Sequence, residues 1–138
     1  MPPVVVSAIE FIVRLPKHKL TLDDVLQAAS VVGGDVLASC TRRDHDNDIH
    51  HITVGDEELY APHFRSTYRR AVSQVPILVI SGLVPDDLDT DLLSRLPASG
   101  VAIHYTYCSV RDHTHFNLAV QTSDNLISLP LLREGTER

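Results

Sequence analysis

The chain has 138 residues, of which 43% are hydrophobic and 22% charged, and its formal net charge is −6 at pH 7. This composition is that of a globular protein and excludes a largely disordered chain, while the negative charge disfavours binding to nucleic acid. Because no apolar run approaches the roughly 20 residues that cross a bilayer, and because the first residues do not resemble a secretory leader, we expect a cytoplasmic protein without membrane binding.

The first half of the chain predicts the element order β-α-β-β-α. A nearly continuous apolar run begins at Val4 and ends before Pro16, which is typical of a mostly buried strand. Thr21 is a candidate helix N-cap, because Asp24 stands three positions later and apolar residues follow at helical spacing. The elements predicted here are strands over 4–15, 35–42 and 49–54 and helices over 22–32 and 64–75.

The second half predicts the same order again after Pro76. Its elements are strands over 77–84, 101–110 and 116–122 and a short helix over 88–96. The stretch 125–132 is apolar but contains Pro130, so we do not assign it as a helix. We expect residues 133–138 to form a frayed tail.

A repeated hexapeptide indicates two copies of one unit. Cys-Thr-Arg-Arg-Asp-His begins at Cys40, and Cys-Ser-Val-Arg-Asp-His begins at Cys108, 68 positions later in a chain whose half-length is 69. Two successive β-α-β-β-α units are typical of ferredoxin-like modules of the α/β (α+β) class, with helices on one face of each antiparallel sheet. We expect these two units to pack into one compact body. The predicted repeats are 1–75 and 76–138.

Two further features have purely structural interpretations. Cys40 and Cys108 lack a Cys-x-x-Cys spacing, and we expect buried, reduced thiols. Tyr105 and Tyr107 are expected to share one face of their strand with Ile103, as part of the packing of the sheet.

The second half contains Gly-Val-Ala-Ile-His-Tyr-Thr-Tyr at 100–107 and a strand over 116–122 that is followed by Asp124. These two segments resemble the second and third strands of ACT domains. In that family a Gly-Val-Asn-Ile-x-Tyr-x-Tyr pattern opens the second strand, and an Asp closes the third strand before the second helix. The matching segments here are 99–110 and 116–124, and a weaker form occurs at 34–37 and 53–56. The resemblance implies a tandem regulatory module without catalysis or cofactor. Such a module binds an amino acid or a similar small molecule where paired modules meet, and acts as a homodimer or through a partner enzyme.

The resemblance also implies which residues bind the ligand. Family ligands lie near the loop from the first strand to the first helix, where a Pro-Gly pair lets the backbone approach closely. Both corresponding loops here keep the Pro but lack the Gly, so a side chain stands where the ligand would touch backbone. The implied ligand-binding residues are Pro16, Lys17, His18, Asp35 and Val36 in the first repeat and Pro85, Asp86, Val101, Ala102 and Ile103 in the second.

The element order places each strand-to-helix loop at the same end of the sheet as the following hairpin turn. We therefore expect Lys17, His18 and Lys19 near Asp44 and His45. The first loop suits a small anion such as a ligand carboxylate, whereas the acidic second loop would repel it. The alternative for the first loop is a set of solvated lysines without a ligand.

Three other functions stay open at this point. A metal site would use Asp44, His45, His113 and His115, since imidazole and carboxylate ligands surround the two Arg-Asp-His turns. A small ferredoxin-like enzyme would use His104, Asp112 and His113 in acid-base chemistry, although no common catalytic motif occurs. A module that only binds other proteins would need no ligand.

Overall fold

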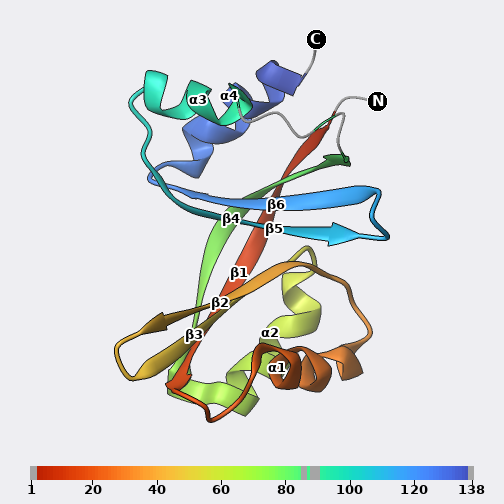
Figure 1. The fold of residues 1–138 in the computed structure, drawn as a ribbon, viewed down its shortest axis with the longest axis vertical. Helices are drawn as coiled ribbons and strands as arrows, with labels where there is room; N and C mark the ends of the chain where they lie inside the picture. The colour runs from red at the N-terminus through yellow and green to blue at the C-terminus, as the bar shows by residue number, and fades with distance from the viewer. Residues whose placement is uncertain (1–2, 85–86, 88–90, 137–138) are drawn as a thin grey trace. The chain divides into compact units, whose positions relative to one another are not determined.

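The computed structural model describes residues 3–84, 87 and 91–136, and its order of elements is β-α-β-β-α twice over (Figure 1). The first series is β1 (Val4–Pro16), α1 (Leu22–Ala29), β2 (Val36–Asp44), β3 (Asn47–Val54) and α2 (Glu57–Tyr68). The second is β4 (Val72–Leu83), α3 (Asp91–Ala98), β5 (Ile103–Arg111), β6 (His115–Thr122) and α4 (Asn125–Thr136). Short 3₁₀ helices, η1 (Ser30–Val32) and η2 (Arg69–Ala71), follow α1 and α2. The predicted mixed fold with antiparallel strands is confirmed, and the tandem-repeat interpretation stays a prediction.

The chain divides into two compact units, Ala8–Val75 and Met1–Ser7 together with Pro76–Arg138. In the Ala8–Val75 unit, β3 lies between β1 and β2 and is antiparallel to both. Alternate residues of β1 and β3 face the two helices and form the core. Phe11 of β1 stacks on Phe64 of α2 with ring centroids 4.6 Å apart. The predicted N-cap of α1 is confirmed, because Thr21 and Asp24 form a reciprocal capping box.

In the second unit, β6 lies between β4 and β5 and is again antiparallel to both. The helices α3 and α4 lie side by side on one face of these strands (Figure 1). Leu96 and Leu132 from the helices are fully buried against Phe116 and Val120 of β6. The first residues of the chain belong here, since Arg133 Nε donates to the carbonyl of Val5 over 3.1 Å.

A bulge interrupts the edge strand at equivalent points of both units. The register shifts between Val36 and Ala38 in β2 and between Ile103 and Tyr105 in β5. The prediction that Ile103 shares a face with Tyr105 and Tyr107 is therefore wrong, because a bulge reverses the alternation. Ile103 packs on the helix side, while the two Tyr rings stack 6.3 Å apart on the other face.

The predicted position of the second helix is wrong. The structure places α2 over Glu57–Tyr68 rather than 64–75, because the Asp56 carboxylate caps the helix by accepting from Leu59 N–H over 3.1 Å. Pro62 lies inside this helix. The helix ends where Arg69 turns into the left-handed region at φ 52°, and β4 starts at Val72.

The C-terminal segment is also more ordered than predicted. A helix covers Asn125–Thr136 despite Pro130, and it includes most of the expected tail. Asp124 Oδ1 accepts from Ile127 N–H over 3.1 Å at its start, and Leu132 anchors it in the core. Among the described residues, no helix is long and apolar enough to cross a membrane.

The prediction of two buried thiols is wrong for Cys108. Both cysteines are free, as expected, but Cys40 is half-buried and Cys108 is exposed. Cys108 lies on β5, which in its unit pairs only with β6 among the described residues, so a strand covers it on one side alone.

Replacement of the carboxylate that caps α2 should destabilise the protein. We expect Asp56→Ala to lower the free energy of unfolding by about 1 kcal/mol, because the amide of Leu59 loses its acceptor, whereas Asp56→Asn should change it by only a few tenths, about 0.3 kcal/mol. Urea denaturation followed by circular dichroism measures both. Equal effects of the two substitutions would contradict the capping role.

Candidate functional site

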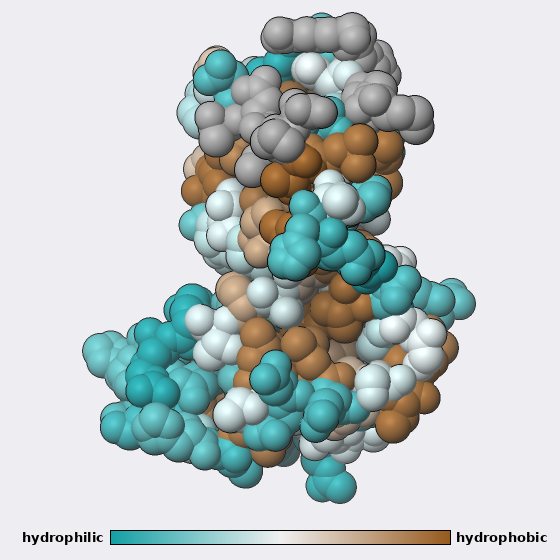
Figure 2. Space-filling model, turned by 45° about the vertical axis from the view of Figure 1, so that its right-hand side comes forward, coloured by the Kyte–Doolittle hydropathy of each residue, from teal (hydrophilic) through white to brown (hydrophobic). Residues whose placement is uncertain are grey.

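The loop between β1 and α1 is fastened to the turn between β2 and β3. Lys17 N–H donates to the carbonyl of Asp46 over 2.8 Å, and the Lys17 ammonium lies 3.8 Å from the Asp46 carboxylate. Val84 N–H makes the equivalent bond to Thr114 O, also 2.8 Å, in the other unit. The expected proximity of loop and turn is confirmed. Hydrophilic side chains cover this end, at the lower left of Figure 2.

Asp48 holds the junction together. Its carboxylate accepts from Arg43 Nε over 2.9 Å and from His18 N–H over 3.1 Å, and its exposed fraction is only 7%. The hydrogen bond from Arg43, followed by the one from the His18 amide, holds the pKa of Asp48 below its usual value. Asp48 is therefore an ionised link between the loop and the hairpin.

Most backbone amides of the β1–α1 loop already donate hydrogen bonds within the chain. His18 adopts φ 65°, the left-handed conformation that glycine prefers, at the loop where the resembled family has its Pro-Gly pair. The amides of Lys17, His18, Lys19 and Thr21 donate to Asp46, Asp48, Pro16 and Asp24 respectively. A ligand at this loop must therefore be recognised by exposed side chains rather than by these amides.

The other predicted ligand residues lie far from the loop within each unit. Asp35 and Val36 are at the opposite end of the sheet: Val36 pairs with Val54, whereas Pro16 pairs with Asn47, seven residues earlier on β3 and about 23 Å away. Val101, Ala102 and Ile103 are likewise at the start of β5, at the end of the sheet away from the β4–α3 loop. Pro85 and Asp86 lie outside the described residues.

The candidate catalytic residues do not converge. His104 is at the start of β5, whereas Asp112 and His113 form the turn at its other end, eight residues or about 26 Å along the strand. Both turn residues have positive φ, 55° and 60°.

The candidate metal ligands are spread over two hairpins. His45 Nε2 lies 3.7 Å from Asp44 Oδ1 on the first hairpin, and on the second His115 Nδ1 is 2.9 Å from the hydroxyl of Thr114. His113 is exposed in the same turn. In the part of the chain that the structure describes, no group of three or more His, Cys, Asp or Glu side chains lies close enough to hold a metal ion.

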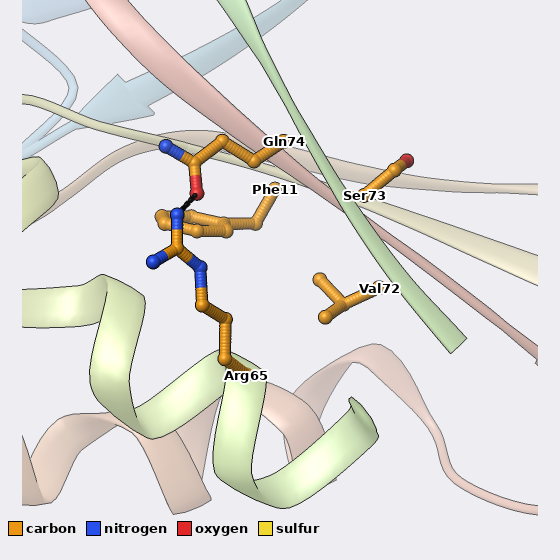
Figure 3. Close-up of a pocket in the computed structure, with 5 residues that line it drawn as sticks. All are labelled: Phe11, Arg65, Val72, Ser73 and Gln74. Carbon is orange, nitrogen blue, oxygen red and sulfur yellow. Dashed lines mark hydrogen bonds between the residues drawn. The ribbon is translucent and has the colours of Figure 1, made fainter. Parts of the chain in front are cut away.

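A pocket beside α2 was missed by the sequence analysis. It has a volume of about 420 Å³ and is lined by Phe11, Arg65, Val72, Ser73 and Gln74 (Figure 3). The Arg65 side chain extends from α2 over the Phe11 ring and donates to Gln74 Oε1 over 2.8 Å. Gln74 Nε2 in turn donates to the carboxylate of Glu57. The misplaced helix hid this pocket, because its residues other than Phe11 come from α2 and the true start of β4.

A buried polar chain was missed as well. Arg42 Nε donates to His51 Nε2 over 3.1 Å, and His51 Nδ1 lies 3.0 Å from Glu10 Oε2. His51 and Glu10 are 2% and 0% exposed. Because Nε2 accepts from Arg42, the imidazole carries its proton on Nδ1 and donates it to Glu10. In the sequence, Glu10 only interrupts an apolar strand, and pairing across strands could not be deduced.

Comparisons with known proteins identify the fold. No protein-family model matches the sequence, and no curated protein does. Among solved structures, protein BT0572 from Bacteroides thetaiotaomicron has a TM-score of 0.68 at 19% identity, over 95% of this chain and 90% of that one. The ligand-free regulatory subunit of aspartate kinase from Thermus thermophilus has a TM-score of 0.65 at 10% identity, over 99% and 98%. Escherichia coli aspartokinase III, in complex with aspartate and ADP, matches with 0.58 at 8%, over 99% of this chain and 33% of that one.

At these identities the likeness is one of fold. The chain has the mixed α+β, ferredoxin-like fold of ACT-like regulatory domains. It covers a regulatory subunit of aspartate kinase nearly end to end, but only a third of a whole aspartokinase.

The ionised state of Asp48 should make stability depend on pH. Because its pKa is lower in the folded chain than in the unfolded one, its contribution is fully present above about pH 4 and is lost as the pH falls through the folded-state pKa. The difference in unfolding free energy between wild type and Asp48→Asn should therefore be constant above about pH 5 and shrink as the pH falls below about 4. Urea titrations at several pH values measure it, and a constant difference would rule out this role.

Relief of the left-handed backbone at His18 should not cost stability. We expect His18→Gly to leave the free energy of unfolding unchanged or to raise it by up to about 1 kcal/mol. Lys19→Gly, at a neighbour outside the left-handed region, should lower it by about 0.5 to 1 kcal/mol through the greater entropy of the unfolded chain. Thermal and urea unfolding compare the pair. A larger loss for His18→Gly than for Lys19→Gly would contradict the assignment of backbone strain.

Proposed function

We propose that this protein is a small-molecule-binding regulatory module of the tandem ACT type, which acts by association with itself or with a partner enzyme. The observation that carries the proposal is the end-to-end likeness to a protein described as the regulatory subunit of aspartate kinase, with 99% of this chain and 98% of that chain aligned. The likeness therefore extends over both β-α-β-β-α series of this chain.

The proposed ligand is an amino acid. Lys17 in the β1–α1 loop supplies a cationic side chain for a carboxylate, and Asp35 supplies an exposed carboxylate for an ammonium group. The loop amides already donate to groups within the chain, so side chains rather than backbone must recognise the ligand. This departs from the pattern of the resembled family. The competing enzyme hypothesis has less support, because His104 lies at the other end of β5 from Asp112 and His113.

The separation of the two ligand-binding sets supports a function through association. Pro16–His18 and Asp35–Val36 lie about 23 Å apart in one unit, which exceeds the length of an amino acid. One ligand can contact both sets of residues only when the β1–α1 loop of one copy meets the start of β2 in another copy. Ligand binding then favours the associated state by its differential affinity for that state. This arrangement supports the proposed homodimer.

A panel of amino acids should contain a ligand that stabilises the protein. A ligand that binds only the folded state adds about 2.7 kcal/mol at a concentration of 100 times its Kd, and so raises the thermal midpoint. We expect Lys17→Glu and Asp35→Ala each to reduce this shift. Differential scanning fluorimetry measures the shift, and sedimentation velocity tests whether the same amino acid promotes the dimer.

Two matched substitutions serve as controls. Lys19→Glu makes the same charge change in the same loop, and Glu58→Ala removes an exposed carboxylate from α2. Both should keep the ligand-induced shift. If the shift survives in Lys17→Glu and Asp35→Ala, the site lies elsewhere; if no amino acid shifts the midpoint, amino-acid sensing is wrong.

A further inference from the structure

A second pocket in the Ala8–Val75 unit is lined by three arginines. Its volume is about 290 Å³, and Arg14, Arg42 and Arg70 come from β1, β2 and η2. Ile12 and Ile49 provide an apolar surface, and Ser73 adds a hydroxyl group. The volume is just below the range of about 300 to 1,000 Å³ that is usual for ligand sites, so the pocket suits a small metabolite.

The strand register fixes two of the arginines around one isoleucine. Arg14 and Arg42 are both paired with Ile49, which lies between them on β3. Residues directly opposite on neighbouring strands share a face, so the two arginines stand about 10 Å apart with the buried Ile49 side chain below them. This face is the one opposite the helices, because Phe11, Val13 and Ile52 occupy the helix side.

Arg42 is held in place by the buried polar chain. Its Nε is bound to His51, and His51 is bound to Glu10. Its two terminal amino groups have no hydrogen-bond partner among the residues that the structure describes. A guanidinium fixed through Nε keeps its outer edge available for an anion, and less side-chain entropy is lost on binding.

The charges near the pocket favour an anion. Arg14 shares its charge with Asp44 at 3.2 Å, and Glu10 is engaged by His51. Arg70 has neither a hydrogen bond nor an ion pair within the described part of the chain. Three guanidinium groups against these two carboxylates leave a positive excess in a chain whose overall charge is −6. An anion is therefore attracted only in the neighbourhood of the pocket, and not by the protein as a whole.

We propose that this pocket is a binding site for a small dianion, a phosphate monoester or a dicarboxylate, in which Arg14, Arg42 and Arg70 are the ligand contacts. His51 and Glu10 are positioning residues that act through Arg42. A planar guanidinium matches both carboxylate and phosphate oxygens, and the apolar surface of Ile12 and Ile49 accommodates the carbon skeleton of the ligand. The site uses other residues than the amino-acid site proposed above, so the protein would sense two kinds of metabolite.

Isothermal titration calorimetry of the full chain tests the site with inorganic phosphate, glycerol phosphate and succinate, at an ionic strength held constant with potassium chloride. We expect Arg42→Gln and Arg70→Gln each to weaken binding about ten-fold, as expected for loss of a charge-assisted hydrogen bond. Arg69→Gln, which removes the neighbouring charge outside the pocket, should change Kd by less than about two-fold. Preference for glycerol phosphate or for succinate decides which dianion the site takes.

Several results would overturn the site. These are absence of binding by all three probes, equal binding by wild type and Arg70→Gln, or binding that sulfate matches in full, which would indicate charge attraction without a shaped pocket. Arg70 is exposed, so its substitution keeps the test valid if Arg42→Gln fails to fold. Lys17→Glu should leave phosphate binding intact, so that failure of the amino-acid site and failure of this site are distinguishable.

The positioning role of His51 has a separate readout. In His51→Gln, the amide oxygen can accept from Arg42 and the amide nitrogen can donate to Glu10, so phosphate binding should be retained. His51→Leu removes both bonds and should weaken binding about as much as Arg42→Gln, and it should have no further effect when Arg42 is already Gln. Independent effects of the two substitutions would show that His51 does not act through Arg42.

Discussion

The register of β3 between β1 and β2 is the constraint on which the Ala8–Val75 unit depends. Pairing of Phe11 with Ile52 places both on the helix side, and the same pairing sets Arg14, Ile49 and Arg42 in a row on the other side. A slip of β3 by one residue would turn Ile52 and Val54 away from α1 and α2 and place His51 and Thr53 there instead. The apolar contacts of the core therefore also determine the position of the arginine pocket and of the Glu10–His51 pair.

Local signals in the sequence were sufficient for much of the fold. The capping box at Thr21, the strand ended by Pro16 and the contact between loop and hairpin follow from short-range chemistry and element order, and the structure has all of them. The two errors in helix assignment concern helices that contain a proline, Pro62 in α2 and Pro130 in α4. The sequence pattern misses the start of α2 at Glu57 and predicts no helix around Pro130. Asp56 and Asp124 cap these helices and buried side chains anchor them, so capping and tertiary packing outweigh the local cost of proline.

The candidate site was less predictable, because its residues meet only through strand pairing. Element order predicts Lys17 beside the turn that contains Asp44 and His45, and in the structure it contacts Asp46 of that turn. Glu10, His51 and Arg42 stand on three different strands and 41 residues separate the first two, so neither periodicity nor spacing connects them. The bulge at His104 was also invisible in the sequence. Simple alternation predicts Ile103 and Tyr105 on the same face of β5, and the extra residue of the bulge places them on opposite faces. The sequence indicates which side chains of one strand alternate between its faces, but it does not indicate which residues they meet on the neighbouring strands.

The bond from Arg133 to the carbonyl of Val5 has a consequence for synthesis on the ribosome. This bond joins residues 128 positions apart. The unit that contains Val5 is therefore completed only after Arg133 has left the ribosomal exit tunnel. The Ala8–Val75 unit is contiguous and can fold as it emerges, while the apolar residues of 4–7 wait for the C-terminal helix. Val5 is buried in the folded protein, but it is exposed until the residues that cover it have been made. In a fragment that ends at Val75 this apolar strand would stay exposed and available for aggregation.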